Sequence, residues 1–197
     1  TEQEARWLSL DLWDQGGSPF DLRKLKGRAC YAGLDLARVK DVSALVLSFP
    51  PEKPGERIRV LCYFWIPEDT VGVRERSGQS FWSEWIREGY VFTTPGNTTD
   101  FKFITQAIID LHGIYNIIEL HYDRMFAGEI INTLAEEGVT LEPHGQGYLS
   151  MAGPVDELER LLMAKEIQHG GNPVLRWMAQ NVVVTTDPAG NKKPDKA

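Results

Sequence analysis

The amino-acid sequence predicts an α/β domain in which helices flank a mixed sheet. Two observations predict this class. First, residues 29–65 hold three apolar, strand-like runs joined by short turns, and consecutive strands joined in this way must be antiparallel. Second, from residue 100 onward helical and strand-like patterns alternate, which is typical of parallel strands with helical crossovers. The sheet should therefore have three antiparallel N-terminal strands followed by parallel strands.

The amino-acid composition limits the class of protein to which the chain can belong. The chain has 197 residues, of which 42% are hydrophobic and 25% charged, as expected for a globular domain with a good core. No apolar stretch approaches the ~20 residues of a membrane helix, and residues 1–6 do not read as a signal peptide. The net charge of −7 argues against a broad, non-specific nucleic-acid binder, but clustered carboxylates that hold metal ions would also make a nuclease acidic.

The first part of the chain is expected to build the antiparallel strands. Residues 1–28 carry irregularly spaced apolar anchors and are predicted to be a linker segment without a core element; the domain proper is predicted for 29–197. An apolar run at 29–37 predicts a buried strand. Residues 42–49, apolar on both faces, predict a central strand, and 57–65 alternate as a third strand.

The second part of the chain is expected to add helices and parallel strands. Residues 66–80 are a polar excursion. Asp100 is a good N-cap for a helix whose apolar stripe starts at Phe101. Helices are predicted at 79–88, 100–113, 127–137, 154–166 and 173–180, and strands at 117–123, 139–142 and 182–186. Residues 187–197 are polar and are predicted to be a flexible tail.

Three aspartates stand out as candidate site residues. Asp35 lies inside the apolar run of the first strand, where aspartate is disfavoured, and Asp123 closes the strand after the 100–113 helix. In the predicted order these strands are parallel neighbours, so both side chains would lie near their carboxyl ends. Asp41 follows in the turn between the first two strands. Hard oxygen ligands suit Mg²⁺ or Mn²⁺, and such ions support phosphodiester hydrolysis.

Structural alternatives stand beside each of these assignments. Asp41 is a natural turn residue, and Asp123 is a natural strand-end turn starter or helix N-cap. Asp35 would need a partner if it were only structural. Other polar and aromatic candidates are expected to be satisfied, solvent-facing or core residues, namely His121, His144, His169, Trp82 and Trp85, with Cys30 and Cys62 as free thiols. The sequence has no zinc-type Cys/His cluster, no G-x-x-x-x-G-K-[ST] loop and no G-x-S-x-G elbow.

Three antiparallel strands followed by α/β crossovers form the RNase H-like order, and within that order the sequence resembles a known family. The resemblance is to the nuclease domain of tailed-bacteriophage large terminase subunits. No single stretch is decisive, but the ordered set is specific. The matching stretches are Tyr31–Ala37 with Asp41–Leu45, Phe64–Glu68, Gly89–Val91, Thr94–Gly96, Tyr122–Arg124 and His169–Met178 leading to Asn181–Val182.

The resemblance implies a metal-dependent endonuclease that cuts double-stranded, concatemeric DNA. It implies that Asp35 and Asp123 are ligands of Mg²⁺ or Mn²⁺, and that Asp41 is a supporting or second-metal acid. Such enzymes carry an N-terminal ATPase domain, so this chain is expected to be an isolated C-terminal part. The implied partners are double-stranded DNA, the ATPase domain, the small terminase subunit and the portal, within the cytoplasm of a bacterial host.

The sequence departs from the family pattern at one point, and two alternative functions stay open. The family has a further acidic ligand on a C-terminal helix, beyond a segment like 191–196; Asp195 does not occupy the matching position, and Asp187 reads as a turn residue. The metal site is therefore expected to be incomplete in this chain. The alternatives are another RNase H-like nuclease, such as a junction resolvase, and a non-catalytic module that docks on a packaging motor or portal.

Overall fold

The computed structural model of the chain describes residues 7–39, 41–125, 128 and 130–195, which divide into two units. One unit holds the described residues of 21–50 and 61–143, and the other holds those of 1–20, 51–60 and 144–197. The sequence predicted no such division, because each unit gathers segments that are far apart along the chain and no change of composition marks the boundaries.

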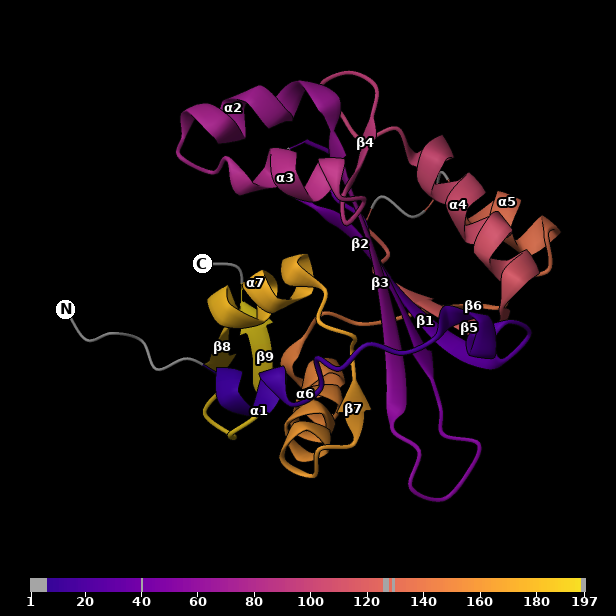
Figure 1. Ribbon diagram of the computed structural model, residues 1–197, viewed down its shortest axis with the longest axis vertical. Helices are drawn as coiled ribbons and strands as arrows, with labels where there is room; N and C mark the ends of the chain where they lie inside the picture. The colour runs from indigo at the N-terminus through magenta and orange to yellow at the C-terminus, as the bar shows by residue number, and fades with distance from the viewer. Residues whose placement is uncertain (1–6, 40, 126–127, 129, 196–197) are drawn as a thin grey trace. The chain divides into compact units, whose positions relative to one another are not determined.

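The first unit contains the main sheet (Figure 1). Its strands are β1 (Ala29–Asp35), β2 (Ser43–Phe49), β3 (Ile58–Pro67), β4 (Phe92–Thr94), β5 (Asn116–Tyr122) and β6 (Leu141–Pro143). The strands lie in the order β4-β3-β2-β1-β5-β6. β1 pairs antiparallel with β2, whereas β5 runs parallel to β1, β6 parallel to β5 and β4 parallel to β3. The predicted mixed sheet, with β2 in a central position, is confirmed.

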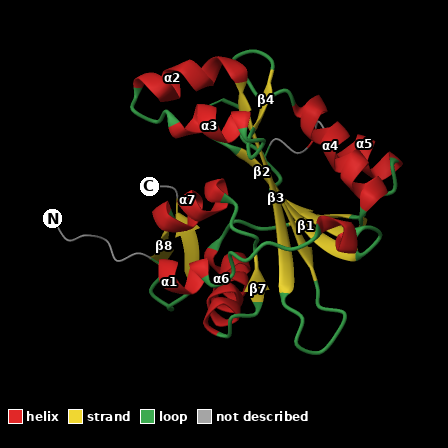
Figure 2. Cartoon of the chain, viewed as in Figure 1, coloured by secondary structure: helices red, strands yellow, loops and turns green. Residues whose placement is uncertain are grey.

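The helices of this unit lie along the sheet. They are η1 (Leu22–Leu25), η2 (Glu68–Thr70), α2 (Val71–Arg76), α3 (Phe81–Arg87), α4 (Phe101–Ile114) and α5 (Ile131–Glu136). α4 begins as expected, since the Asp100 carboxylate accepts a hydrogen bond from the Lys102 N–H at 3.0 Å. Figure 2 shows α4 and α5 side by side next to the strands. Part of the helix predicted at 127–137 falls on residues 127 and 129, which lie outside the described residues.

The second unit is built from helices and a small hairpin. It contains α1 (Leu10–Asp14), α6 (Tyr148–Met163), β7 (Ile167–Gln168), α7 (Pro173–Asn181), β8 (Val183–Thr186) and β9 (Lys192–Asp195). β7 pairs with Ile58 and Arg59, the first residues of β3, which belong to this unit, and β8 with β9 is an antiparallel hairpin. Asn172 caps α7 through hydrogen bonds from the N–H groups of Val174 and Leu175, directly before Pro173.

Three sequence-based expectations are corrected here. Residues 1–28 do contribute core elements, because Leu8, Trp13 and Leu25 are buried and α1 lies within this stretch. The 187–197 tail is not wholly irregular, because β9 pairs with β8 and Lys192 reaches the Glu159 carboxylate at 2.9 Å. Residues 66–80 include the short helix α2.

The first strand also differs from its prediction. β1 ends at Asp35 and alternates, with Cys30, Ala32 and Leu34 buried and the residues between them exposed. It is therefore a strand with one open face, not one buried on both faces. The error has a simple cause, because small residues such as Ala29 and Gly33 raise the apolar count without requiring burial.

Candidate functional site

The carboxyl ends of β1 and β5 bring Asp35 and Asp123 to the same edge of the sheet. In the parallel register Gly33 pairs with His121 and Leu34 with Tyr122. Asp35 is the last residue of β1, and Asp123 directly follows the last residue of β5. Residues that face each other in a parallel pair have side chains on the same face, so this register directs both carboxylates to one side of the sheet.

That side of the sheet is open at β1. Asp35 is exposed, and so are Tyr31 and Gly33 on the same face of the strand. A Cβ atom added at Gly33 would meet no atom within 4 Å, so the surface is open at Gly33. Because the Asp35 carboxylate is exposed to solvent, it does not carry the cost expected for a charge inside a buried strand.

Asp123 is half-buried and also has a structural role. One of its carboxylate oxygens accepts a hydrogen bond from the Met125 N–H at 3.0 Å, which forms an Asx turn directly after β5. The strand-end turn expected as an alternative is thus present. This bond orients the carboxylate and leaves it near the strand end, so it is compatible with a second role in binding a cation.

Asp41 lies in the loop between β1 and β2 and is exposed. The turn predicted at residues 38–41 includes Lys40, which lies outside the described residues. Burial lowers the pKa of the Arg74 guanidinium on α2, and the electrostatic interaction with the Asp41 carboxylate opposes this shift without cancelling it. Sequence reasoning missed Arg74, because it comes from a helix 33 positions away in the chain.

A serine that sequence reasoning also missed fixes the same loop. Ser43 is buried at the start of β2, and its Oγ accepts a hydrogen bond from the Ala37 N–H at 2.9 Å. The hydroxyl also donates to the Ala37 carbonyl at 3.1 Å. Both backbone groups of Ala37 are thereby satisfied, and the loop that carries Asp41 is closed at its base.

The remaining histidines and aromatic residues behave as expected. His121 of β5 makes an ion-pair contact with Glu119, two residues earlier on the same strand. His169 is buried, and its Nε2 lies 2.8 Å from the Trp13 carbonyl oxygen. Trp82 and Trp85 are core residues of α3. The two cysteines are free, and burial raises the pKa of Cys30 to about 11 and of Cys62 to about 12, so neither is a reactive thiolate.

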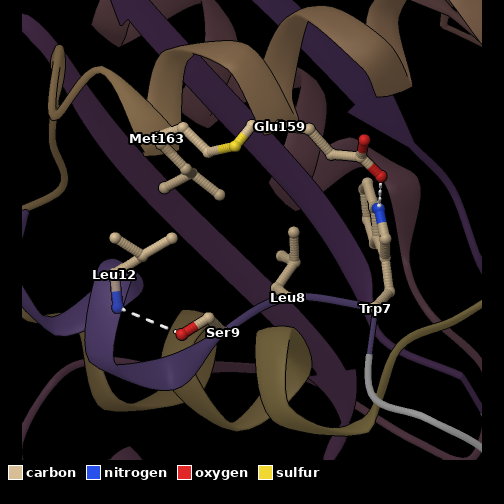
Figure 3. A pocket seen from close by; sticks show the side chains of 7 residues that line it. Trp7, Leu8, Ser9, Leu12, Glu159 and Met163 are labelled. Carbon is tan, nitrogen blue, oxygen red and sulfur yellow. Dashed lines mark hydrogen bonds between the residues drawn. The ribbon is translucent and has the colours of Figure 1, made fainter.

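The second unit has a pocket of about 270 Å³ between α1 and α6 (Figure 3). Its lining is mostly apolar and consists of Trp7, Leu8, Ser9, Leu12, Glu159, Leu162 and Met163. Burial raises the pKa of Glu159, but hydrogen bonds from Lys192 and Trp7 and the charge of Lys192 outweigh it, so the pKa lies below its usual range. This carboxylate is held in structural contacts and has no second acid beside it in the lining, so the pocket does not resemble a metal site.

The residues at the β1–β5 edge fit a divalent cation in their chemistry. Carboxylate oxygens are hard ligands, and Mg²⁺ is commonly held by one or two carboxylates together with water and substrate phosphates. Within the described ranges, no group of three or more His, Cys, Asp or Glu side chains is placed to hold a metal ion. No described helix is both long enough and apolar enough to cross a membrane.

The strand order defines the class of this protein: it has an RNase H-like mixed α/β fold. The model of the family "Terminase large subunit, endonuclease domain" matches residues 1–197. The chain belongs to this family.

One relative and two solved structures give the scale of the likeness. The chain is 34% identical over 193 residues to the large terminase subunit of Enterobacteria phage HK97, covering 97% of this chain and 37% of that protein. The crystal structure of the HK97 large terminase superposes with a TM-score of 0.86 at 32% identity, over 98% of this chain and 40% of that one. The large terminase nuclease of thermophilic phage G20c with bound magnesium has a TM-score of 0.59 at 12% identity, over 100% and 90%. The chain thus spans well under half the length of the HK97 protein.

Proposed function

We propose that this chain is the metal-dependent endonuclease domain of a phage DNA-packaging terminase and hydrolyses phosphodiester bonds of double-stranded, concatemeric DNA. The observation that supports the proposal most strongly is the parallel pairing of β1 and β5, because Asp35 ends β1 and Asp123 directly follows β5. Membership of the terminase endonuclease family supports the same reading.

Each acid has a role in this proposal. Asp35 and Asp123 would hold Mg²⁺ or Mn²⁺, and Asp41 would support the site from the neighbouring loop. When bound, such a cation supplies positive charge that makes a water molecule a better nucleophile and stabilises the leaving oxygen. The chain's own contribution is to keep two carboxylates on adjacent rigid strands, with the Asx turn at Asp123 and the Ser43–Ala37 hydrogen bonds fixing the surrounding backbone.

The proposal extends to the cellular setting of the chain. We propose that it acts with an ATPase domain of the same longer protein, with a small terminase subunit and with a portal, in the cytoplasm of the bacterial host. The support is again the family and the partial coverage of the HK97 relative, of which this chain spans 37%.

Manganese binding tests the proposal directly and does not depend on activity. Titration calorimetry of the unmodified chain with Mn²⁺ should show binding that Asp35→Asn or Asp123→Asn abolishes and that Asp110→Asn, at an exposed acid of α4, leaves intact. The same variants should be compared in cleavage of linear and four-way-junction DNA. No carboxylate-dependent Mn²⁺ site would favour the non-catalytic docking module, and a strong preference for the junction would favour a resolvase.

A further inference from the structure

Arg74 is held in a fixed orientation next to the candidate site. Its guanidinium carbon lies 4.4 Å from the ring centre of Trp82, which is fully buried on α3. The Arg74 carbonyl accepts a hydrogen bond from the Gln79 N–H at 3.0 Å, and the Gln79 side chain in turn accepts one from the Trp82 indole at 3.2 Å. Stacking on a buried ring restricts the plane of the guanidinium, so little conformational entropy remains to be lost when it binds a ligand.

Arg38 repeats this arrangement from another element. It lies in the loop after β1, and its guanidinium carbon is 5.3 Å from the ring centre of Phe101, the first residue of α4. Its carbonyl accepts a hydrogen bond from the Thr99 N–H at 2.8 Å, which ties the loop to the segment before α4. Two arginines from different parts of the chain are therefore each positioned by an aromatic ring.

Both arginines are linked to the loop that carries Asp41. Arg38 lies between Asp35 and Asp41 in the loop itself, and Arg74 interacts electrostatically with Asp41. Arginine stays protonated even where burial opposes its charge. Two arginines oriented by aromatic rings are therefore associated with the loop that follows Asp35 and carries Asp41.

We propose that Arg38 and Arg74 form a phosphate-binding subsite for the backbone of a nucleic-acid strand, which places the strand against Asp35 and Asp123. The inference rests on the proposed function and deepens it. A guanidinium presents a planar fork of N–H donors that matches a phosphate, and stacking on a ring occupies its face while leaving its edge to donate. Phosphate contacts of this kind position a strand without reading its sequence.

The salt dependence of DNA binding tests the subsite. In chains that carry Asp35→Asn, and with EDTA present, binding of a short duplex is measured by fluorescence anisotropy across a range of salt concentrations. Arg74→Met and Arg38→Met should each reduce the slope of log K against log salt by about 0.9, the amount expected for one lost phosphate contact. Methionine keeps an unbranched side chain for contact with the ring while removing the charge.

The matched control is Arg87→Met on α3, at a side chain that is 74% exposed and pairs with Glu84 at 3.7 Å. It removes the same charge and should leave the slope unchanged. The subsite would be refuted if all variants had the same slope of log K against log salt, or if Arg87→Met reduced the slope as much as Arg38→Met and Arg74→Met. It would also be refuted if the chain that carries only Asp35→Asn did not bind the duplex at the lowest salt concentration. If Arg74→Met does not fold, the salt dependence of DNA binding by Arg38→Met tests the subsite.

Cleavage by the unmodified chain is measured separately, so that the two proposals fail in different ways. An inactive chain whose slopes still fall on loss of Arg38 or Arg74 would refute the proposed function and support the subsite. An active chain whose slopes do not change would support the function and refute the subsite. A purely structural role for Arg74 predicts a lower unfolding temperature in Arg74→Met with an unchanged slope.

Discussion

The exposure of Asp35 explains how a strand can end in a charge without a stability cost. Asp35 lies on the open face of β1, and Asp123 directly follows the neighbouring parallel strand β5, so we expect repulsion between these two like charges when no cation is bound. In the proposed function these two acids would bind a cation.

A first prediction concerns that repulsion. Asp35→Asn should abolish metal-dependent cleavage while leaving the unfolding temperature in EDTA unchanged or slightly higher, because it removes one of two close negative charges. Thermal unfolding followed by circular dichroism, with and without Mn²⁺, measures this; Asp110→Asn is the control. A variant that is strongly destabilised in EDTA would show instead that Asp35 is needed for folding.

A second prediction concerns Ser43. Ser43→Ala removes both hydrogen bonds to Ala37 and leaves buried backbone groups without a partner, so we expect a loss of about 1–3 kcal/mol in the free energy of unfolding. Urea denaturation is the measurement. Ser48→Ala, at a half-buried serine on the other face of β2, is the matched control, and an equal loss there would mean that the Ala37 contacts contribute nothing special.

At the scale of single residues, the sequence could indicate the candidate aspartates but not the residues around them. Asp35 and Asp123 were found because each breaks or ends an apolar run, a signal that lies within a few residues. Arg74 and Ser43 were missed because their roles arise from contacts with residues elsewhere in the chain. An arginine on a short polar helix gives no local sign that it lies over Trp82.

Among the elements, those with a strong apolar period were predicted well and the short ones were not. α4 has buried residues at helical spacing and a side-chain cap, and it lies where the pattern predicts. β9 has the sequence Lys-Lys-Pro-Asp, which has no strand propensity, and it forms because Asp187 holds the turn through hydrogen bonds from the N–H groups of Ala189 and Asn191. Turn geometry and packing outweighed composition there.

His169 packs α1 against the segment before α7. Its ring is buried and stacks on Trp13 with ring centres 4.5 Å apart. The contacts define a neutral ring, in which Nε2 donates to the Trp13 carbonyl and Nδ1 accepts from the Gly171 N–H at 3.3 Å. Burial, the largest effect, lowers the pKa of His169 from its usual 6.5.

The third prediction follows from the sign of that shift. Between the lowered folded pKa and about 6.5 the unfolded chain binds more protons than the folded chain, so the free energy of unfolding should fall as pH falls through this window. Unfolding temperatures measured at a series of pH values test this. His169→Gln, which does not titrate, should weaken the dependence, whereas His144→Gln, at a half-buried histidine of the same unit, should keep it. Identical pH profiles for all three proteins would contradict the prediction.

For the whole molecule, the order of strands was predictable and the division into two units was not. Short turns between β1, β2 and β3 and helical patterns around β5 leave few possible topologies, and the observed sheet is among them. The second unit combines residues near both ends of the chain with residues 51–60. Such a grouping depends on long-range contacts, which no local sequence pattern predicts. These contacts join Leu8, Trp13, Leu162 and Ala179.

Charge is the property of the whole molecule that bears most on the proposed function. The chain has 21 Lys and Arg residues against 28 Asp and Glu, for a net charge of −7. Phosphate contacts supply most non-specific affinity for DNA, so this chain alone should bind DNA weakly and depend on a few well-placed cations. Charged side chains near the β1–β5 edge then matter more than the average surface.

The last prediction follows from that balance. Cleavage of supercoiled plasmid by this chain should require high protein concentration and Mn²⁺ or Mg²⁺, and it should show little sequence preference. It should also fall steeply between low and moderate salt, because contacts to phosphate release counterions from the DNA and this release becomes less favourable as salt rises. Agarose-gel assays at both salt concentrations, with and without EDTA, measure these properties, and Asp123→Asn serves as the inactive reference. Cleavage that persists in EDTA would exclude the metal-dependent reaction. Tight binding that does not respond to salt would mean that this acidic surface meets DNA through contacts other than those to phosphate.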